Sequence, residues 1–316
     1  MTEKHMTKIT LKAIDKITLL FCIWMLCLIA IGRNHVLLPS VHFIIFLTII
    51  AGVLFLVWLT DFMKNASKPE NCPSPFCRKV RPKVYAVLTF IRHYYPIPLY
   101  AFFFEASCAT SRVFFHSWLD PFFMNIDKSI FGYLPSIEWA FRYKAFWLNE
   151  WLHFSYFSYY LMIVVLPVIF YLKKRKAMDE LVFVVSLVFY FCYFVYSWLP
   201  VVGARYIPEA MQWTTQKSRG FFTNFMAVIY TYTPHLGGAF PSSHVAIAVV
   251  LTFITLKYFQ PLGIICAVLT FFLAIATVYC HYHWFVDAVF GILTGGVGYL
   301  AAEKIFNKLT VQENEG

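Results

Sequence analysis

Residues 40–62 of this chain read SVHFIIFLTIIAGVLFLVWLTDF, and within them only His42 and Asp61 carry a titratable side chain. An apolar run of this length, wound into an α-helix, is long enough to cross a hydrocarbon core about 30 Å thick. Because no water is present there to accept backbone hydrogen bonds, a run that crosses the membrane has to be helical. Residues 40–62 therefore predict a transmembrane helix.

Similar apolar runs recur along the whole chain. Of its 316 residues, 60% are hydrophobic and only 13% are charged. A soluble domain needs about a quarter of its residues charged to cover its surface. We predict an all-α polytopic membrane protein with about eight transmembrane helices. The expected spans are residues 17–33, 40–62, 84–105, 149–172, 181–200, 242–257, 261–280 and 284–303.

The basic residues are distributed unevenly among the segments that join these spans. The arm before residue 17, the segment 63–83 and the turn 173–176 are rich in Lys and Arg, whereas the long loops 106–148 and 201–241 hold fewer for their length. Positive charge marks the cytoplasmic side of a membrane protein. We therefore expect both termini in the cytoplasm and the long loops on the periplasmic, extracellular or lumenal face. The net charge of +10 is attributed to anionic headgroups and not to nucleic acid.

Three polar clusters fall on that outer face, and the first is PVVGARY at residues 200–206. Its arginine, Arg205, lies where a predicted helix leaves the membrane. Such an arginine can bind an anion, or it can extend to the lipid headgroups without a further role. Taken alone, this cluster favours the second interpretation.

The second cluster is GGAFPSSH at residues 237–244, at the start of a predicted span. The glycines allow the backbone to turn, and a proline suits the first helical position. Ser242 and Ser243 place hydroxyls beside unpaired backbone N–H groups, so this helix start is suited to an anion. A plain capping sequence explains the proline and one serine. It does not explain the imidazole of His244 at the same helix start.

The third cluster is YCHYHWFVD at residues 279–287, at the start of the last predicted span. His283 and Asp287 are four residues apart and share one face of a helix. Asp287 can accept a hydrogen bond from one ring nitrogen of His283, which leaves the other nitrogen as a nucleophile or base. An aspartate inside a membrane helix is costly without a partner. The alternative is a purely structural His–Asp pair.

Taken together, PSSH at 241–244, HWFVD at 283–287 and GAR at 203–205 resemble the type-2 phosphatidic acid phosphatase superfamily. That superfamily includes lipid phosphate phosphatases, vanadium haloperoxidases, and the inositol phosphorylceramide and sphingomyelin synthases. The stretches DKSIFG at 127–132 and SYY at 158–160 look like its inositolphosphotransferase-like branch.

The resemblance covers roughly residues 115–300 and implies a six-helix catalytic core. It implies two parts of the chain. Residues 1–105 would hold N-terminal membrane helices with a basic cytoplasmic arm and loop, and residues 106–316 would form the catalytic membrane domain.

The resemblance also implies a mechanism. His283 would attack phosphorus and form a phosphohistidine, with Asp287 orienting the ring. His244 would protonate the leaving alcohol and then activate the acceptor. The charge on the phosphoryl oxygens has to be stabilised in the transition state. The residues implied for this role are Arg205, Ser242, Ser243 and Gly238. No metal or other cofactor is required.

Two departures from the phosphatase pattern concern phosphate-binding cations. The pattern has a lysine seven residues before the first arginine, where this chain has Trp198. It has a Ser-Arg pair ahead of the third-cluster histidine, where this chain has Ala276 and Thr277. The synthase branch also lacks that pair, which favours phosphotransfer over hydrolysis. The outer-face candidates for replacing the cations are Arg112, Lys217, Arg219 and His281.

The leading hypothesis is a lipid phosphotransferase that acts on a phospholipid or lipid phosphate in the outer leaflet, with no obligate protein partner. Transfer to water, as in a lipid phosphate phosphatase, is the first alternative. A non-catalytic lipid-binding or transport protein on the same scaffold is another: the missing cations favour it, and the complete His/His/Asp set argues against it.

A metal-dependent site is a further alternative, because imidazole and carboxylate groups also bind zinc or iron. Its ligands would be His244, His281, His283 and Asp287. Membrane metallo-oxidases usually have richer histidine arrays, which argues against it. Arg92, His93 and Glu105 lie within an expected span, where they either lie in the substrate cleft or, for Arg92, only pair inside the bundle.

Overall fold

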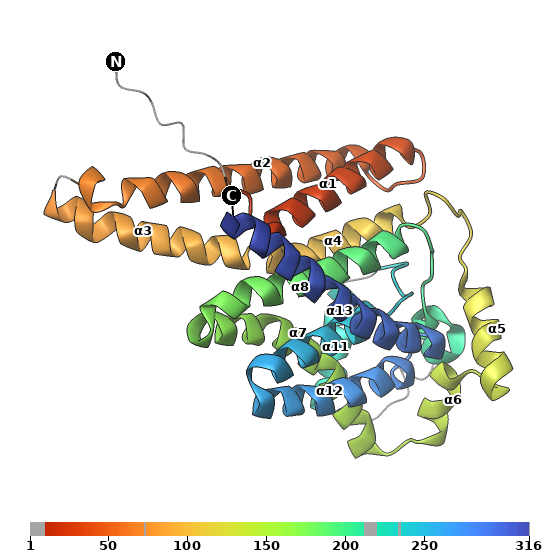
Figure 1. Cartoon of the computed structure of the whole chain (residues 1–316). Helices are drawn as coiled ribbons and strands as arrows, with labels where there is room; N and C mark the ends of the chain where they lie inside the picture. Colours follow the sequence, from red (N-terminus) through yellow and green to blue (C-terminus); the bar gives the residue numbers. More distant parts are fainter. Residues whose placement is uncertain (1–9, 73, 212–219, 233–234, 316) are drawn as a thin grey trace.

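The computed structural model of the chain describes residues 10–72, 74–211, 220–232 and 235–315. Within those ranges the protein contains helices and no strands, as the apolar runs predict (Figure 1). The α-helices are α1 (Ala13–Ile31), α2 (Pro39–Ala66), α3 (Pro75–Tyr94), α4 (Pro96–Thr110), α5 (Asp120–Phe131), α6 (Pro135–Arg142), α7 (Phe146–Lys173), α8 (Arg175–Tyr196), α10 (Phe221–Tyr232), α11 (Ser243–Tyr258), α12 (Gln260–Tyr279) and α13 (Phe285–Glu315), with short 3-10 turns η1 (Pro69–Asn71) and η2 (Ala204–Tyr206).

Six of these helices are long and apolar enough to cross a membrane: α1, α2, α7, α8, α12 and α13, the last over Phe285–Val311. Helix α11 is apolar but shorter. This confirms the prediction of an all-α, multi-pass membrane protein.

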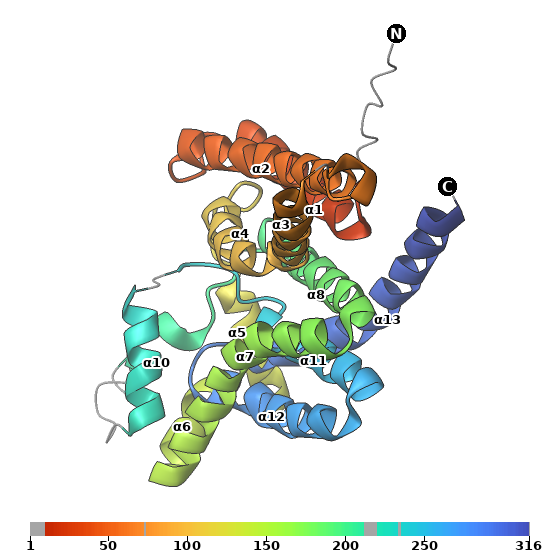
Figure 2. The ribbon, with the colours of Figure 1, turned by 90° about the vertical axis from the view of Figure 1, so that its left-hand side faces the viewer.

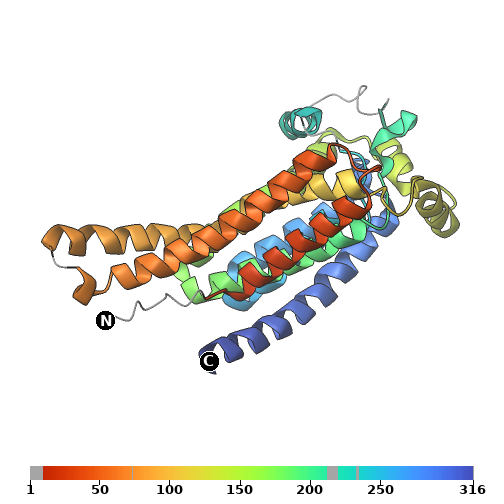
Figure 3. The ribbon, with the colours of Figure 1, turned by 90° about the horizontal axis from the view of Figure 1, so that it is seen from above.

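The third expected span, 84–105, is not one helix. Helix α3 ends at Tyr94 and α4 begins at Pro96. Proline lacks the backbone N–H that would continue the hydrogen-bond ladder, and its ring clashes with the preceding turn. The two helices follow one another along the bundle and together cover the path expected of one span (Figure 3).

Helix α11 lies at the centre of the C-terminal bundle and packs against α7, α8, α12 and α13 (Figure 2). Its residues from Val245 to Leu251 are buried. Glycines let α13 approach it closely: a Cβ atom added at Gly291 would lie 2.7 Å from the carbonyl oxygen of Ser242, and one at Gly295 would lie 2.5 Å from that of Ala246. Because of this close approach, the N-terminal ends of α11 and α13 lie side by side.

The N-terminal helices are fastened to the bundle by a buried ionic cluster. The guanidinium of Arg92 on α3 lies 2.8 Å from the carboxylate of Asp15 on α1 and 3.3 Å from that of Asp61 on α2. His93 lies 3.1 Å from Asp179 on α8. Buried charges in a membrane protein need such partners. Of the two alternatives for Arg92, pairing within the bundle is the one that the structure shows.

The two ends of the bundle differ in what they carry. The short helices α5, α6 and α10 lie at one end, whereas α1 begins and α13 finishes at the opposite end (Figure 3). The N-terminal ends of α11 and α13 lie at the same end as α5. All three polar clusters therefore occur at the end of the bundle that carries the short helices.

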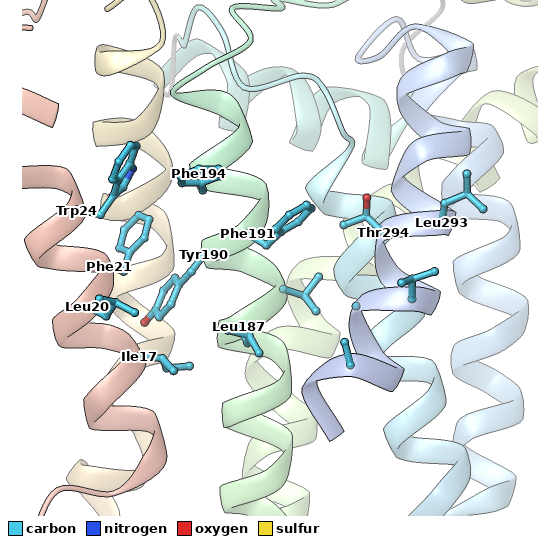
Figure 4. A pocket seen from close by; sticks show the side chains of 14 residues that line it. Ile17, Leu20, Phe21, Trp24, Leu187, Tyr190, Phe191, Phe194, Leu293 and Thr294 are labelled. Carbon is cyan, nitrogen blue, oxygen red and sulfur yellow. The ribbon is translucent and has the colours of Figure 1, made fainter. Parts of the chain in front are cut away.

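A hollow of about 630 Å³ lies between α1, α8 and α13 (Figure 4). Leu20 and Trp24 line it from α1, Tyr190 from α8, and Leu293 from α13. Among the described residues, no acidic, basic or histidine side chain lines it. It is an apolar groove between spanning helices and is separate from the three polar clusters.

Candidate active site

The three polar clusters are joined to one another through their backbones. The N–H of Ala239 in the second cluster donates to the carbonyl of Val201 in the first, at 2.9 Å. The N–H of Ser242 donates to the carbonyl of Asp287 in the third cluster, at 3.0 Å. Gly203 in the first cluster, with φ of 86°, lies so close to the third that an added Cβ atom would be 2.5 Å from the carbonyl oxygen of Tyr282. Segments separated by tens of residues thus form one continuous site.

His244 occupies the first turn of α11. The hydroxyl of Ser242, the N-cap residue, accepts a hydrogen bond from the N–H of Val245 at 3.5 Å. The N–H of Ser243 donates to the hydroxyl of Tyr196 at 3.1 Å. Both serines are buried. The hydroxyl of Ser242 thus has the capping role that the simpler interpretation of this cluster assigned to one serine.

Gly238 lets the loop before α11 lie against α4. Its φ is 76°, which a residue with a Cβ atom rarely adopts, and an added Cβ atom would lie 2.8 Å from the sulfur of Cys108. The carbonyl of the preceding Gly237 accepts a hydrogen bond from the thiol of Cys108 at 3.5 Å. Gly238 therefore positions the loop that carries His244.

His283 and Asp287 approach each other as their spacing predicts. Nδ1 of His283 lies 3.5 Å from Oδ2 of Asp287. These two atoms do not form a hydrogen bond. Oδ2 instead accepts a hydrogen bond from the N–H of Trp284 at 2.9 Å. Both side chains are buried. Asp287 therefore caps its own helix and also faces Nδ1 of the histidine, which leaves Nε2 as the ring nitrogen turned away from it.

The protonation of His283 is set by its surroundings. Burial lowers the pKa of His283 to about 4, and a hydrogen bond to the backbone of Ala239 opposes this change. The ring is consequently neutral near pH 7. A neutral imidazole has a lone pair available for attack on an electrophile.

His244 and His283 face the same small space. The centroids of their rings are 6.0 Å apart. Aromatic rings of α7 surround His244: the Tyr156 ring stacks on it at 4.9 Å and the Tyr159 ring lies at 4.6 Å. Tyr159 belongs to the Ser-Tyr-Tyr stretch at 158–160, so that stretch lies at the site.

Arg205 of η2 packs against Tyr230 of α10. Its Nη2 donates to the carbonyl of Tyr230 on α10 at 3.0 Å, and its Cζ lies 3.7 Å from the centroid of the Tyr230 ring. The Tyr230 ring in turn lies 4.6 Å from that of Tyr282 in the third cluster. A guanidinium fixed in this way is a preorganised donor for an anion.

Two aspartates of α5 hold the clusters in place, a role that was not predicted from the sequence. The carboxylate of Asp120 accepts from the N–H groups of Val202, at 3.0 Å, and Gly203, at 2.8 Å. It also accepts from the indole N–H of Trp284 at 2.9 Å. Asp120 thereby ties the first cluster to the third.

Asp127 has the corresponding role at the start of α13. It accepts hydrogen bonds from the N–H groups of Phe285, at 2.8 Å, and Val286, at 3.1 Å. Burial raises the pKa of Asp127, and these two hydrogen bonds oppose the increase. The only signal for it in the sequence is its place in the DKSIFG stretch at 127–132.

Glu150, near the start of α7, fixes α10 and was also not foreseen. Its carboxylate accepts from the N–H groups of Phe222, at 2.8 Å, and Thr223, at 3.2 Å. A Cβ atom added at Gly220 would lie 2.2 Å from the carboxylate carbon. Glu150 therefore sets the position of α10, which carries Tyr230.

The positions that carry cations in the phosphatase pattern have other roles in this chain. Trp198 stacks on Phe114, with ring centroids 4.0 Å apart. Ala276 and Thr277 are fully buried. The carbonyl of Thr277 accepts from the N–H of His283 at 3.0 Å, so this residue supports the third cluster through its backbone.

The candidate replacements for the two missing phosphate-binding cations differ in where they lie. The guanidinium of Arg112 lies over the ring of Trp118, 5.3 Å from its centroid, and lines a separate small hollow with His35 and His116. His281 is buried, and its Nδ1 contacts the carbonyl of Ser136 at the start of α6. The other two candidates lie outside the described residues, namely Lys217 and Arg219.

The metal-dependent alternative has no ligand set in the described part of the chain. Among those residues, no three His, Cys, Asp or Glu side chains are grouped as a metal ion would need.

Comparison with known proteins gave one match. The family model for the PAP2 superfamily, the type-2 phosphatidic acid phosphatases and their relatives, matches residues 123–301, which is more than half of the chain. All three polar clusters, α5 from Phe123 onward and the tyrosines of α7 lie inside that range. No curated protein and no solved structure matches the chain.

Proposed function

The chain belongs to the PAP2 superfamily, and from this we propose that it is an integral-membrane lipid phosphotransferase working through a phosphohistidine on His283. Membership implies phosphoryl transfer in a membrane protein. The observation that supports the specific assignment is the arrangement of His283 beside Asp287, with the His244 ring 6.0 Å from that of His283. A nucleophile, an orienting carboxylate and a second histidine are the groups that this chemistry requires.

In the first step, Nε2 of His283 attacks the phosphorus of a lipid phosphate ester. The bond from phosphorus to the leaving alcohol oxygen breaks, and His244 gives a proton to that oxygen. In the second step, the hydroxyl of an acceptor attacks phosphorus, His244 takes up the hydroxyl proton, and the bond from phosphorus to nitrogen breaks. Asp287 stabilises the charge on the ring, and Arg205 binds the phosphoryl oxygens.

We propose an alcohol, and not water, as the acceptor. Two phosphate-binding cations of the phosphatase pattern are replaced by Trp198 and Thr277, and aromatic rings of α7 surround His244. An aromatic lining suits an amphipathic acceptor and gives little support to a free water. Hydrolysis is the alternative outcome of the same two steps.

The orientation is also a proposal: both termini in the cytoplasm and the active site on the opposite face. It is supported by the segment 78–83 and the turn 173–176, which are rich in Lys and Arg and lie at the end of the bundle opposite the histidines (Figure 3). Protease access to a C-terminal tag in sealed vesicles of known orientation tests it. Cleavage of the tag from the non-cytoplasmic side would reverse the assignment.

Purified protein should be incubated with a panel of phospholipids and lipid phosphates, with and without alcohol acceptors. We expect a transfer product that depends on the acceptor, an acid-labile phosphoenzyme in the wild type, and neither in His283→Ala. Turnover that survives in His283→Ala would refute the proposed nucleophile. Free phosphate as the main product in the presence of acceptors would identify a phosphatase.

A further inference from the structure

Three tyrosine hydroxyls gather beside the histidines. The hydroxyl oxygens of Tyr156 on α7 and Tyr230 on α10 are 2.5 Å apart. Tyr160 lies one turn further along α7, and its ring centroid is 6.3 Å from that of Tyr156. We call these three residues the hydroxyl cluster.

The hydroxyl cluster lies between the proposed acid–base histidine, His244, and the guanidinium of Arg205, the one that the described residues place there. The Tyr156 ring stacks on His244 at 4.9 Å, and the Tyr160 ring meets the same histidine edge-on at 6.1 Å. At the other side, Arg205 lies over the Tyr230 ring. A phosphoryl group held between Arg205 and the histidines would therefore lie next to the hydroxyl cluster.

The hydroxyl cluster has donors to offer such a group. Each tyrosine hydroxyl has one proton, and its orientation adjusts to the partner present. The contact between Tyr156 and Tyr230 uses only one of their two protons. Burial keeps the pKa of Tyr230 well above its usual range, so this hydroxyl stays protonated. The hydroxyls that now bond to one another can therefore turn towards a phosphoryl oxygen.

We propose that the hydroxyls of Tyr156, Tyr160 and Tyr230 bind the phosphoryl oxygens of the substrate in place of cations, and that they select a phosphodiester over a phosphomonoester. This inference rests on the proposed function. A phosphodiester carries one negative charge, whereas a monoester carries close to two near pH 7. Neutral donors stabilise a second charge less well than lysine or arginine does, so a site built from one guanidinium and hydroxyls favours the singly charged ester.

The test uses Tyr160→Phe and Tyr230→Phe, each of which removes one hydroxyl and keeps the ring. The matched control is Tyr190→Phe, which removes a buried hydroxyl that bonds to Thr18, 3.0 Å away in the interface of α8 with α1. Two properties are measured: the affinity for vanadate, a phosphate analogue, and kcat/KM for bis(p-nitrophenyl) phosphate and p-nitrophenyl phosphate. Thermal melting in detergent identifies any variant that fails to fold.

We expect each site variant to lose about ten- to a hundredfold in vanadate affinity and in kcat/KM for the diester, because hydrogen bonds to a charged group are being removed. The control should match the wild type, and the wild type should prefer the diester. Folded site variants with unchanged vanadate affinity would overturn the role of the hydroxyls. A wild-type preference for the monoester would overturn the selection.

The vanadate measurement needs no turnover, so it keeps the two proposals apart. Loss of vanadate affinity in the tyrosine variants, with no turnover on any substrate, would refute the proposed function and support the binding role. Turnover that requires His283 but is insensitive to the tyrosine hydroxyls would support the proposed function and refute the binding role of the hydroxyls. The double variant Lys217→Gln/Arg219→Gln tests the two outer-face cations, and a loss of vanadate affinity larger than that of either tyrosine variant would overturn the replacement of cations by hydroxyls.

Discussion

At the scale of single residues, Asp287 has two tasks that one substitution separates. Its Oδ2 caps α13 through the N–H of Trp284, and the same atom lies 3.5 Å from Nδ1 of His283. An amide oxygen can accept the capping hydrogen bond, but it cannot stabilise positive charge on the ring. The two tasks therefore differ in whether they need the negative charge.

Asp287→Asn should therefore lower kcat by roughly a thousandfold or more, in line with the loss when an orienting aspartate of a catalytic triad becomes asparagine. Its melting temperature should stay close to that of the wild type, because the cap is preserved. Steady-state kinetics and thermal melting in detergent measure the two effects. A variant that melts early and loses activity in proportion would show that Asp287 acts through stability alone.

His283 predicts a specific dependence on pH. Its pKa is lowered from 6.5 to about 4 by burial, so the folded protein binds fewer protons at this site than the unfolded chain. Because of His283, the protein therefore loses stability as the pH falls from about 6.5 towards 4. Above about pH 6.5 this histidine has no such effect on stability. The nucleophile likewise stays neutral down to about pH 4.

The rate of phosphoenzyme formation should fall as His283 becomes protonated, with an apparent pKa near 4 and not near 6.5. Rapid-quench measurement of the phosphoenzyme between pH 4 and 8 gives this pH dependence. Circular dichroism at each pH identifies conditions in which the protein has unfolded. A loss of the rate with an apparent pKa near 6.5, in protein that remains folded, would contradict a buried neutral His283.

At the scale of elements, the contact of α11 with α13 aligns the ends that carry His244 and His283. The two helices touch where α13 has Gly291 and Gly295, and the backbone of α11 fills the space that a side chain would need. A Cβ atom added at Gly296, one residue further on, would have only an ordinary van der Waals contact, with Phe253 at 4.0 Å. These neighbouring glycines form a matched pair.

Gly295→Ala should destabilise the protein by about 1–3 kcal/mol, because its Cβ atom would meet the Ala246 carbonyl oxygen at 2.5 Å and the helices would have to separate. Gly296→Ala should leave stability unchanged or raise it slightly, because alanine favours the helix. Denaturation of both variants in mixed micelles compares them directly. Equal effects would show that the contact between α11 and α13 tolerates a side chain.

At the scale of the whole molecule, an ionic cluster at the end of the bundle opposite His244 and His283 joins the N-terminal helices to the rest of the protein (Figure 3). Arg92 is almost fully buried and pairs with Asp15 and Asp61, while Lys12 and His93 pair with Asp179. Removing one member of a buried cluster leaves its partners charged and unpaired. We therefore expect this cluster to contribute to assembly of the fold and not to the chemistry.

Arg92→Ala should destabilise the protein by about 3–5 kcal/mol, as expected when a buried ion pair loses one partner. The control is Arg142→Ala, which breaks a pair with Glu138 on α6 in which both side chains are largely exposed, and it should cost less than about 1 kcal/mol. Denaturation midpoints measure both. The folded fraction of Arg92→Ala should keep the wild-type KM, and a changed KM would place Arg92 in the substrate cleft.

The sequence by itself determined the class of the protein and the pairing of His283 with Asp287 in its candidate site. Length and apolarity of a run such as 40–62 are local properties, and the bilayer requires such runs to be helical. The distribution of Lys and Arg predicts, without any knowledge of packing, that the three polar clusters share one face. The spacing of His283 and Asp287 placed them on one helix face, because the geometry of a helix is the same in every protein.

The tertiary structure alone decided which distant residues surround that pair. Asp120, Asp127 and Glu150 act on backbone N–H groups more than seventy residues away, and no local pattern records such a contact. The meeting of Tyr156 and Tyr230 depends on how α10 docks against α7. Hydrogen bonds and close packing act over a few ångströms, so these assignments follow only once the helices are placed in space.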